Sequence, residues 1–285
     1  MEGEPSPLHD YIAIQVEPTF LVISGAIIIF TNVLAVFLHF FRSSSCFGML
    51  LMLLITNIVY AILIVCCGIA RNMPTPKSVV SMSKILAFKS LTPIAAQQIV
   101  AISSSLLALD RVILMTFPVT YKFSKISLKL SLTTICLNVA ILASLCGPLL
   151  DMNAFYGIFR QMKFICIMYL YPLSMLAETL FSIMFMFKFR KFVNSNVEDF
   201  IKREAKQNNH IVLCQTLCHT LINAFPNILI AVDNVFNIEP FYHYYVVPFE
   251  MFYCAISVTL SSLFTLYKII PKRSVFKVSN SRAVT

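Results

Sequence analysis

Seven long apolar segments constrain this chain more than any other feature of its sequence. A helix needs about 20 apolar residues to cross the hydrocarbon core of a bilayer. Charged residues make up 12% of the chain, whereas soluble domains carry about 25%. The sequence therefore predicts an all-α membrane protein with seven transmembrane helices. The expected spans are Phe20–Phe41, Phe47–Ala70, Leu91–Phe117, Leu130–Leu150, Phe164–Phe187, Ile211–Asp233 and Tyr244–Tyr267.

Helices are favoured over a membrane β-barrel because the apolar runs are continuous rather than alternating. The stretch Arg71–Ser90 is polar and contains prolines, and the third helix can begin within it. An alternative count of six spans applies if the region around Ile165–Met168 is only interfacial. Seven is the better count, since Phe164–Phe187 contains a full-length apolar run.

The charges at the two ends of the chain predict its orientation. Residues 1–19 form a short acidic N-terminus without Lys or Arg, and residues 268–285 form a basic tail without an acid. With seven spans between them (residues 20–267), an outer N-terminus places most of the Lys and Arg residues in the cytoplasm, as the positive-inside rule requires. The net charge of +9 is thus explained by topology and the lipid bilayer, and binding to nucleic acid is not expected.

The cysteines do not predict a metal or cofactor site. Nine are scattered, mostly within apolar runs, and no CxxC pair occurs. Cys214 and Cys218 have helical spacing, and most of the nine cysteines are expected to be buried free thiols. A disulfide between Cys166 and either Cys66 or Cys67 is compatible with the topology, because all three lie near the outer ends of spans.

An acid and an arginine, Asp110 and Arg111, stand side by side at the end of the third span. Charges at that depth in lipid are costly, so such residues usually have partners and a function. The simpler interpretation is a helix end whose arginine reaches the headgroups, and an isolated Asp-Arg pair would favour it. Here Pro118 and Tyr121 follow eight and eleven residues after the acid. That spacing, with seven spans and the expected sidedness, favours a functional pair.

This spacing resembles the third-helix signature of rhodopsin-like G-protein-coupled receptors. The weaker similarities are a polar pair between the first two helices (Asn32 and Asn57), prolines in the fifth and sixth (Pro172 and Pro226), and a final tyrosine (Tyr267).

The sequence also departs from that family. It contains no tryptophan, and Leu263 and Phe264 replace the Asn-Pro expected before the closing tyrosine. Val112 stands where an aromatic is usual, Pro93 takes the place of the amine-binding aspartate, and no cysteine lies near Leu86. A conformational switch in this chain is therefore expected to be built differently from the family's usual one.

With these losses and its short termini, the chain is most similar to a nematode serpentine chemoreceptor. The resemblance implies a plasma-membrane receptor of sensory neurons that binds a small extracellular molecule and activates a heterotrimeric G protein. Asp110 would hold Arg111 in a closed state. A ligand that prefers the open state would free Arg111 for the G protein.

The third span offers candidate ligand-binding residues. Gln97, Ser104 and Arg111 recur every seven residues and so lie on nearly the same helix face. That row is expected to face inward, with Gln97 and the adjacent Gln98 in the outer half, where an external ligand could reach them. An interhelical hydrogen bond explains such a glutamine equally well.

The seventh span adds Glu250, Tyr253 and Ser257, which share one helix face. The carboxylate is expected near the membrane edge, where it could bind a polar or cationic ligand. An ion pair between Glu250 and Lys89 is equally compatible with the sequence.

The fifth and sixth spans contain the remaining polar candidates. His219, Asn223 and Asn227 recur every fourth residue beside Pro226. This stripe could move on activation, because a proline weakens a helix locally, and Asn227 could contact the ligand. A packed polar seam is the favoured alternative, and Glu178 is expected to join His219 and Asn223 in it.

A second functional class remains open, a small transporter or proton-coupled carrier built around Glu178, His219 and Glu250. Transporters commonly show internal repeats and glycine-broken helices, and this sequence has neither. Enzymatic activity is not expected, because no span carries a Ser/His, paired-Asp or His-x-x-x-His arrangement.

Overall fold

The computed structural model describes residues 16–42, 48–73, 79–150, 171–193, 213–214, 217–224 and 250–270. All secondary structure within these ranges is helical. The α-helices are α2 (Glu17–Arg42), α3 (Gly48–Asn72), α4 (Val79–Thr116), α5 (Pro118–Phe123), α6 (Ile126–Leu150), α8 (Tyr171–Val193) and α12 (Glu250–Ile269), and η3 (His219–Ala224) is a π-helix. The predicted all-α class is confirmed.

Five described segments are long and apolar enough to cross a membrane. They lie in α2, α3, α4, α6 and α12, so a protein with several membrane-crossing helices is confirmed by length and composition. The fifth expected span corresponds to α8, which is not among the five. Most of the sixth expected span lies outside the described residues.

The helix boundaries refine the expected spans. The third helix does begin early, at Val79, and Pro93 lies inside it. A proline is tolerated there because neighbouring groups in a membrane bundle can satisfy the backbone groups that it frees. The fourth helix begins at Ile126 rather than Leu130, directly after a turn in which Lys125 has a φ of 48°.

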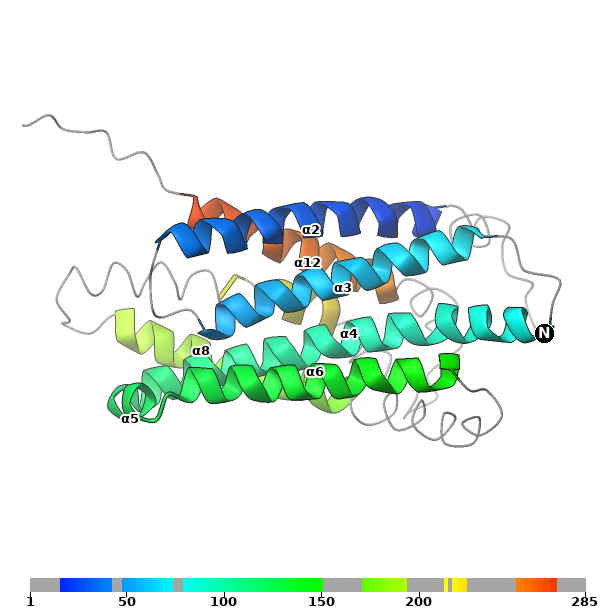
Figure 1. Ribbon diagram of the computed structural model, residues 1–285. Coiled ribbons are helices and arrows are strands. Elements are labelled where there is room, and N and C mark those ends of the chain that lie inside the picture. The colour runs from blue at the N-terminus through cyan, green and yellow to red at the C-terminus, as the bar shows by residue number, and fades with distance from the viewer. Residues whose placement is uncertain are drawn as a thin grey trace, which may run out of the picture.

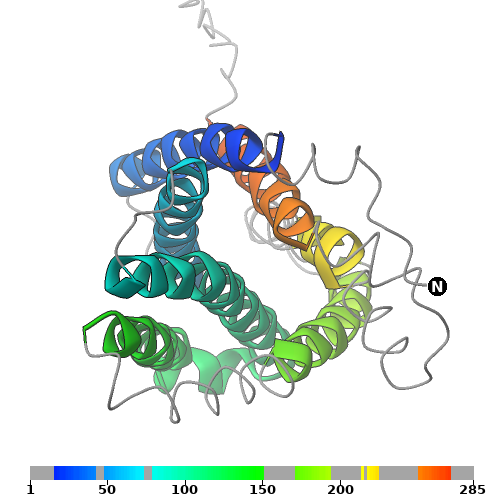
Figure 2. The ribbon, with the colours of Figure 1, turned by 90° about the vertical axis from the view of Figure 1, so that its right-hand side faces the viewer.

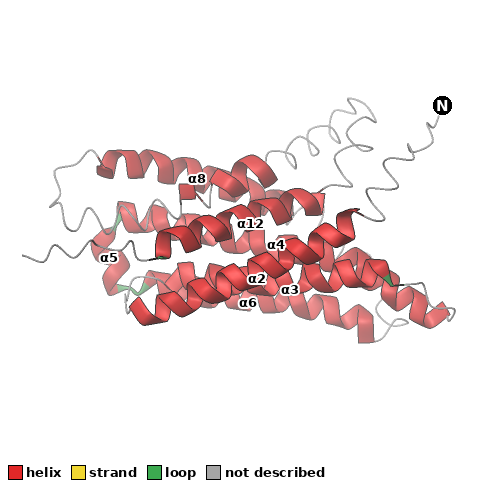
Figure 3. Cartoon of the chain, turned by 90° about the horizontal axis from the view of Figure 1, so that it is seen from above, coloured by secondary structure: helices red, strands yellow, loops and turns green. Residues whose placement is uncertain are grey.

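The long helices form a bundle with two distinct ends (Figure 1). Viewed along its length, α2, α3, α4, α8, η3 and α12 follow one another around a ring, and α6 packs outside α4 (Figure 2). The view from above shows the same long helices side by side (Figure 3). The C-terminal ends of α2, α4, α8 and α12 lie at one end of the bundle, which we call the Arg111 end.

Close contact between α2 and α3 sets the register of that part of the bundle. Gly25 lies against Ala61 and Val65, and Gly68 lies against the backbone of Pro18. Residue numbers therefore fall along α3 as they rise along α2. This antiparallel register brings Asn32 and Asn57 to the same level. A polar pair between the two helices requires such a position.

Replacing Gly68 with alanine is expected to destabilise the bundle. A Cβ at this position would lie 2.8 Å from the carbonyl oxygen of Pro18, and backbone cannot move aside as easily as a side chain. The expected loss is about 1–3 kcal/mol, as for other overpacked cores, measured as a lower thermal midpoint in detergent. Gly48→Ala is the matched control, because its new Cβ would meet only side-chain atoms of Ser127 and Ser131. An equal or larger loss in the control would contradict this account.

Candidate functional site

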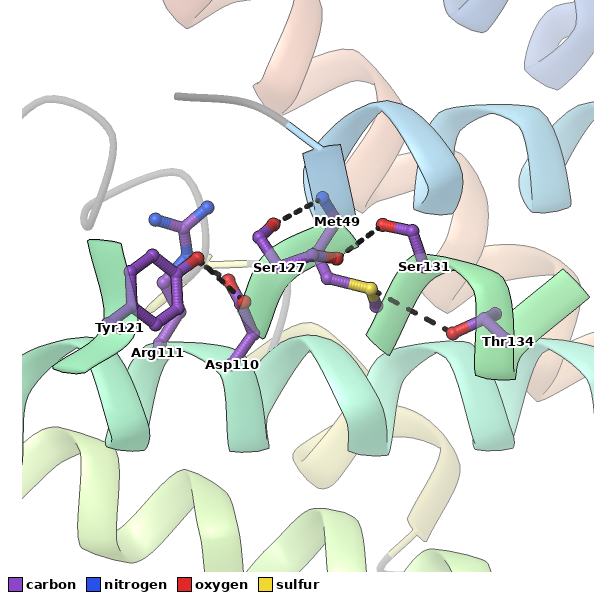
Figure 4. Close-up of polar contacts among 7 residues, drawn as sticks. All are labelled: Met49, Asp110, Arg111, Tyr121, Ser127, Ser131 and Thr134. Atoms are coloured by element: carbon purple, nitrogen blue, oxygen red, sulfur yellow. Dashed lines mark hydrogen bonds and ion pairs between the residues drawn. The ribbon is translucent and has the colours of Figure 1, made fainter. Parts of the chain in front are cut away.

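Asp110 and Arg111 are buried at the Arg111 end of α4, where they form an ion pair. Their side chains are 0% and 5% exposed, and Arg111 Nε lies 3.6 Å from Asp110 Oδ2. Neither of these two atoms makes a hydrogen bond among the described residues. The other carboxylate oxygen, Oδ1, accepts a hydrogen bond of 2.7 Å from the hydroxyl of Tyr121 (Figure 4). The structure thus brings together three of the residues that the sequence singled out.

The short helix α5 positions Tyr121 for this contact. The chain leaves regular helix at Phe117, and α5 begins at Pro118, a residue suited to a first helical position. A hydrogen bond from the Tyr121 amide to the Phe117 carbonyl spans the break at 2.9 Å. The spacing of Pro118 and Tyr121 after Asp110 thus has a simple geometric consequence. The first starts the helix that turns the second back towards Asp110.

The beginning of α6 completes this site (Figure 4). The hydroxyl of Ser127 interacts with that of Tyr121 and accepts a 3.2 Å hydrogen bond from the amide of Met49, in the first turn of α3. Thr134 contacts the sulfur of the same methionine at 3.8 Å. The site therefore connects α3, α4, α5 and α6 through contacts that begin at Asp110, the partner of Arg111.

The Tyr121 hydroxyl is held in its protonated, donating form. Burial, with the nearby charge of Asp110, raises the pKa of Tyr121 to about 12. Because this pKa lies above the ordinary value of tyrosine, the hydroxyl's contribution to stability is complete below about pH 10 and is lost as pH rises through about 12. The hydrogen bond to Asp110 is therefore present throughout the physiological range.

Tyr121→Phe is expected to remove one high-pKa step from the ultraviolet titration of phenolate absorbance. The difference between the wild type and the variant should be centred near pH 12, because Tyr121 is partly buried beside a carboxylate. A difference centred near pH 10, the ordinary value, would contradict the hydrogen-bonded geometry. Thermal unfolding of the same samples would show whether the variant remains folded.

A second polar cluster lies deeper in the bundle, and sequence reasoning missed it. The Asn138 amide of α6 donates to Thr56 Oγ1 at 3.3 Å and to Ser103 Oγ at 3.2 Å. Ser103 Oγ in turn donates to Thr56 Oγ1 at 3.2 Å. Polar side chains of this kind hold membrane helices together. The available signal was Asn138 itself, the one side-chain amide of its span.

The predicted pair Asn32 and Asn57 is fully buried, with 0% exposure for both residues. The Asn32 amide donates to Ser262 Oγ of α12 at 2.8 Å, so its partner is in the last span rather than in α3. Neither polar atom of the Asn57 amide makes a hydrogen bond among the described residues. The two asparagines therefore share a level without sharing a hydrogen bond.

The candidate ligand-binding residues that can be placed lie on α4 and α12 and are buried or half-buried. Gln97 and Gln98 are 5% and 1% exposed, Ser257 is fully buried, and Tyr253 is half-buried. Their neighbours Ala96, Ile99 and Val100 of α4 and Cys254, Ala255 and Val258 of α12 belong to one buried apolar cluster that α2 and α3 also join. Both amide atoms of Gln98 are without a hydrogen-bond partner in the described part of the chain.

Several other candidates cannot be placed as side chains. Glu250 begins α12, and His219 and Asn223 lie in η3, but their side chains are outside the described set, as are Pro226 and Asn227 entirely. Glu178, on α8, is fully buried, and its carboxylate oxygens have no hydrogen-bond partner among the described residues.

Tyr267, the predicted closing tyrosine, lies on the outside of α12. Its side chain is 60% exposed, and the Lys268 ammonium lies 5.6 Å from its ring. No described contact joins Tyr267 to Asp110 or Arg111. In this conformation the tyrosine is not part of the ion-pair site.

A second ion pair, between a buried acid and a partly exposed arginine, lies at the opposite end of the bundle. Arg71 Nη1, at the end of α3, lies 2.7 Å from the carboxylate of Glu17, the first residue of α2. Nη2 of the same guanidinium contacts the sulfur of Met251 in α12 at 3.7 Å. The nearby Cys66 and Cys67 form no disulfide with a described residue, and Cys166 lies outside the described residues, so the suggested disulfide stays untested.

The geometry of the Asp110–Arg111 site is the main guide to function. We compared the chain with models of known protein families and with curated protein sequences, and it matches none of them.

Proposed function

We propose that this chain is a chemosensory G-protein-coupled receptor that binds a small extracellular molecule and activates a heterotrimeric G protein. The observation that carries the proposal is the buried Asp110–Arg111 pair with Tyr121 bonded to the acid. Membrane proteins seldom keep a charge at this depth without a functional use for it. The resemblance to nematode chemoreceptors adds the sensory neuron and its plasma membrane as the expected location.

In the proposed mechanism, the resting state keeps Arg111 against Asp110 at the Arg111 end of the bundle. Tyr121 and Ser127 hold the acid and the surrounding helix ends in place. A ligand bound between α4 and α12, near Gln97, Gln98 and Ser257, shifts the population towards a state in which Arg111 is free. The arginine then contacts the G protein from the cytoplasm.

The directions of the described helices support seven crossings. In α8 and α12 alike, the N-terminal part lies away from the Arg111 end and the C-terminal part lies at it (Figure 1). Two spans that run in the same direction need an odd number of crossings between them along the chain. The π-helix η3 lies next to both helices, where a sixth span would run. An outer N-terminus then puts the Arg111 end in the cytoplasm.

A ligand screen in heterologous cells tests the proposal. Cells that express the chain are exposed to small volatile and polar compounds, with calcium and cyclic nucleotide as readouts. A ligand-dependent signal is expected, and Arg111→Ala should abolish it while surface expression is retained. Lys191→Ala is the control, because it removes an exposed positive charge in the last turn of α8, near the same end of the bundle, without touching the pair.

A signal that survives Arg111→Ala at equal surface expression would contradict the proposed coupling. Uptake of the ligand into proteoliposomes without any G protein would instead favour a carrier. One observation supports that second function. Glu178 is a fully buried carboxylate without a described hydrogen-bond partner, as a proton-coupling residue would be. Loss of uptake in Glu178→Gln, with no effect of Arg111→Ala, would establish the carrier.

A further inference from the structure

The segment that follows α4 carries the most exposed large apolar side chain of the described residues. We call residues 117–129, which comprise α5 and the first turn of α6, the rim segment. Phe123 is 84% exposed, Phe117 is 60% exposed and Leu128 is 56% exposed. Exposing such apolar side chains to water would be unfavourable. The segment lies at the end of the bundle rather than along its sides (Figure 1).

The inward contact of Tyr121 explains why Phe123 points outward. Successive residues on a helix are rotated by about 100° about its axis. The side chains of residues i and i+2 therefore face roughly opposite sides of the helix. Tyr121 turns towards Asp110 (Figure 4), and Phe123 must therefore face away from the bundle. The exposure of this aromatic ring follows from the same hydrogen bond that completes the ion-pair site.

The charge of the rim segment has a single sign. It contains Lys122, Lys125 and Lys129, and no acid occurs between Phe117 and Leu150. The last two lysines are exposed. A surface that combines exposed aromatic and aliphatic side chains with lysines complements an anionic surface that has an apolar layer beneath it.

The rim segment also continues an outward-facing apolar stripe on α6. Leu128, Leu132, Ile135 and Val139 are 56%, 54%, 42% and 58% exposed and recur at helical spacing. Because this span is long and apolar enough to cross a membrane, the stripe is its lipid-facing side. Lys125 and Lys129 lie at one end of the stripe, and this places the rim segment at headgroup level.

We propose that the rim segment is an interfacial anchor for an anionic lipid surface. Phe123 and Leu128 insert at the boundary between headgroups and acyl chains, and Lys125 and Lys129 bind the phosphate or carboxylate groups of the lipids. The anchor goes beyond the proposed function and does not depend on it. A carrier with the same α5 would bind the membrane in the same way.

The absence of tryptophan from the chain makes a direct test available. Phe123→Trp introduces a single fluorescent reporter at the exposed position. The full-length variant is reconstituted in liposomes of phosphatidylcholine, alone or mixed with phosphatidylserine, without any partner protein. A blue-shifted emission is expected, with a loss of fluorescence when the acyl chains are brominated near the headgroup, and both effects should be larger with phosphatidylserine.

Two further variants serve as controls. Leu132→Trp places the reporter further along the lipid-facing stripe, where acyl chains brominated at depth should quench it equally in both lipid mixtures. Lys125→Gln with Lys129→Gln, in the Phe123→Trp background, should abolish the difference between the mixtures. All of these side chains are exposed, so the variants are expected to fold.

Three results would overturn the proposal. The first is a red-shifted emission from the Phe123→Trp variant that aqueous iodide quenches in both mixtures, since the ring would then be in water. The second is equal quenching by bromolipid in both mixtures, since the surface would then not be selective for anionic lipid. The third is a blue shift only after a purified G protein is added, since the occupant would then be a protein. None of these readouts involves signalling, so the anchor and the receptor function can fail separately.

Discussion

Asp110→Asn is expected to lower the stability of the protein strongly and, in the proposed receptor, to raise its signalling without ligand. The substitution keeps the shape and the acceptor for Tyr121 but leaves Arg111 as a buried positive charge without its counter-charge. Removing one member of a buried ion pair typically costs about 3–5 kcal/mol. The measurements are the thermal midpoint of the purified protein and the basal second-messenger level at matched surface expression.

The double variant Asp110→Asn with Arg111→Gln separates the charge effect from a packing effect. Because it removes both charges, it should be more stable than Asp110→Asn alone, and it should lack the raised basal signal. If the two variants were equally unstable, the loss would come from packing around residue 110 instead. A basal signal unchanged in Asp110→Asn would show that the pair does not restrain the resting state.

The sequence predicted the elements of this site because their positions depend on local geometry. Asp110, Arg111 and Tyr121 lie within eleven residues of one another, so one helix end and one short turn suffice to bring them together. The row of Gln97, Ser104 and Arg111 is likewise a property of a single helix, and all three residues are buried. Predictions of this kind need only the helical period.

Contacts between different spans could not be predicted in the same way. The hydrogen bond between Asn32 and Ser262 joins residues 230 positions apart, and the cluster of Thr56, Ser103 and Asn138 needs three helices in one register. In a membrane bundle every face is apolar enough for lipid, so hydropathy does not show which faces meet. Packing of small residues decides this, as at Gly25 and Gly68.

The Glu17–Arg71 pair is an interhelical contact that the sequence could have revealed. Glu17 opens α2 and Arg71 lies in the last turn of α3, positions at which an acid and a base each complement the helix dipole. Consecutive spans run antiparallel, so these two ends are neighbours. The contact between Glu17 and Arg71 thus follows from the topology of the first two spans, although Arg71 also begins a polar stretch of the sequence.

Arg71→Ala is expected to destabilise the protein as strongly as Asp110→Asn, without raising basal signalling. The carboxylate of Glu17 is 6% exposed, so loss of its partner leaves a buried negative charge, at a cost of about 3–5 kcal/mol. The contact of the same guanidinium with Met251 is lost as well, which loosens α12 from α2 and α3. Thermal unfolding and surface expression are the measurements.

Glu17→Gln with Arg71→Met tests the origin of that loss. It removes both charges and keeps an apolar side chain of similar length near Met251, so it should recover much of the stability. Failure to recover would mean that the guanidinium acts mainly through its shape and hydrogen bonds. The two ion pairs then differ in what they do. Breaking the one at Arg71 should change only the amount of folded protein, whereas breaking the one at Arg111 should change the signal of each folded molecule. A raised basal signal per receptor in Arg71→Ala would show instead that both ends of the bundle restrain the same resting state.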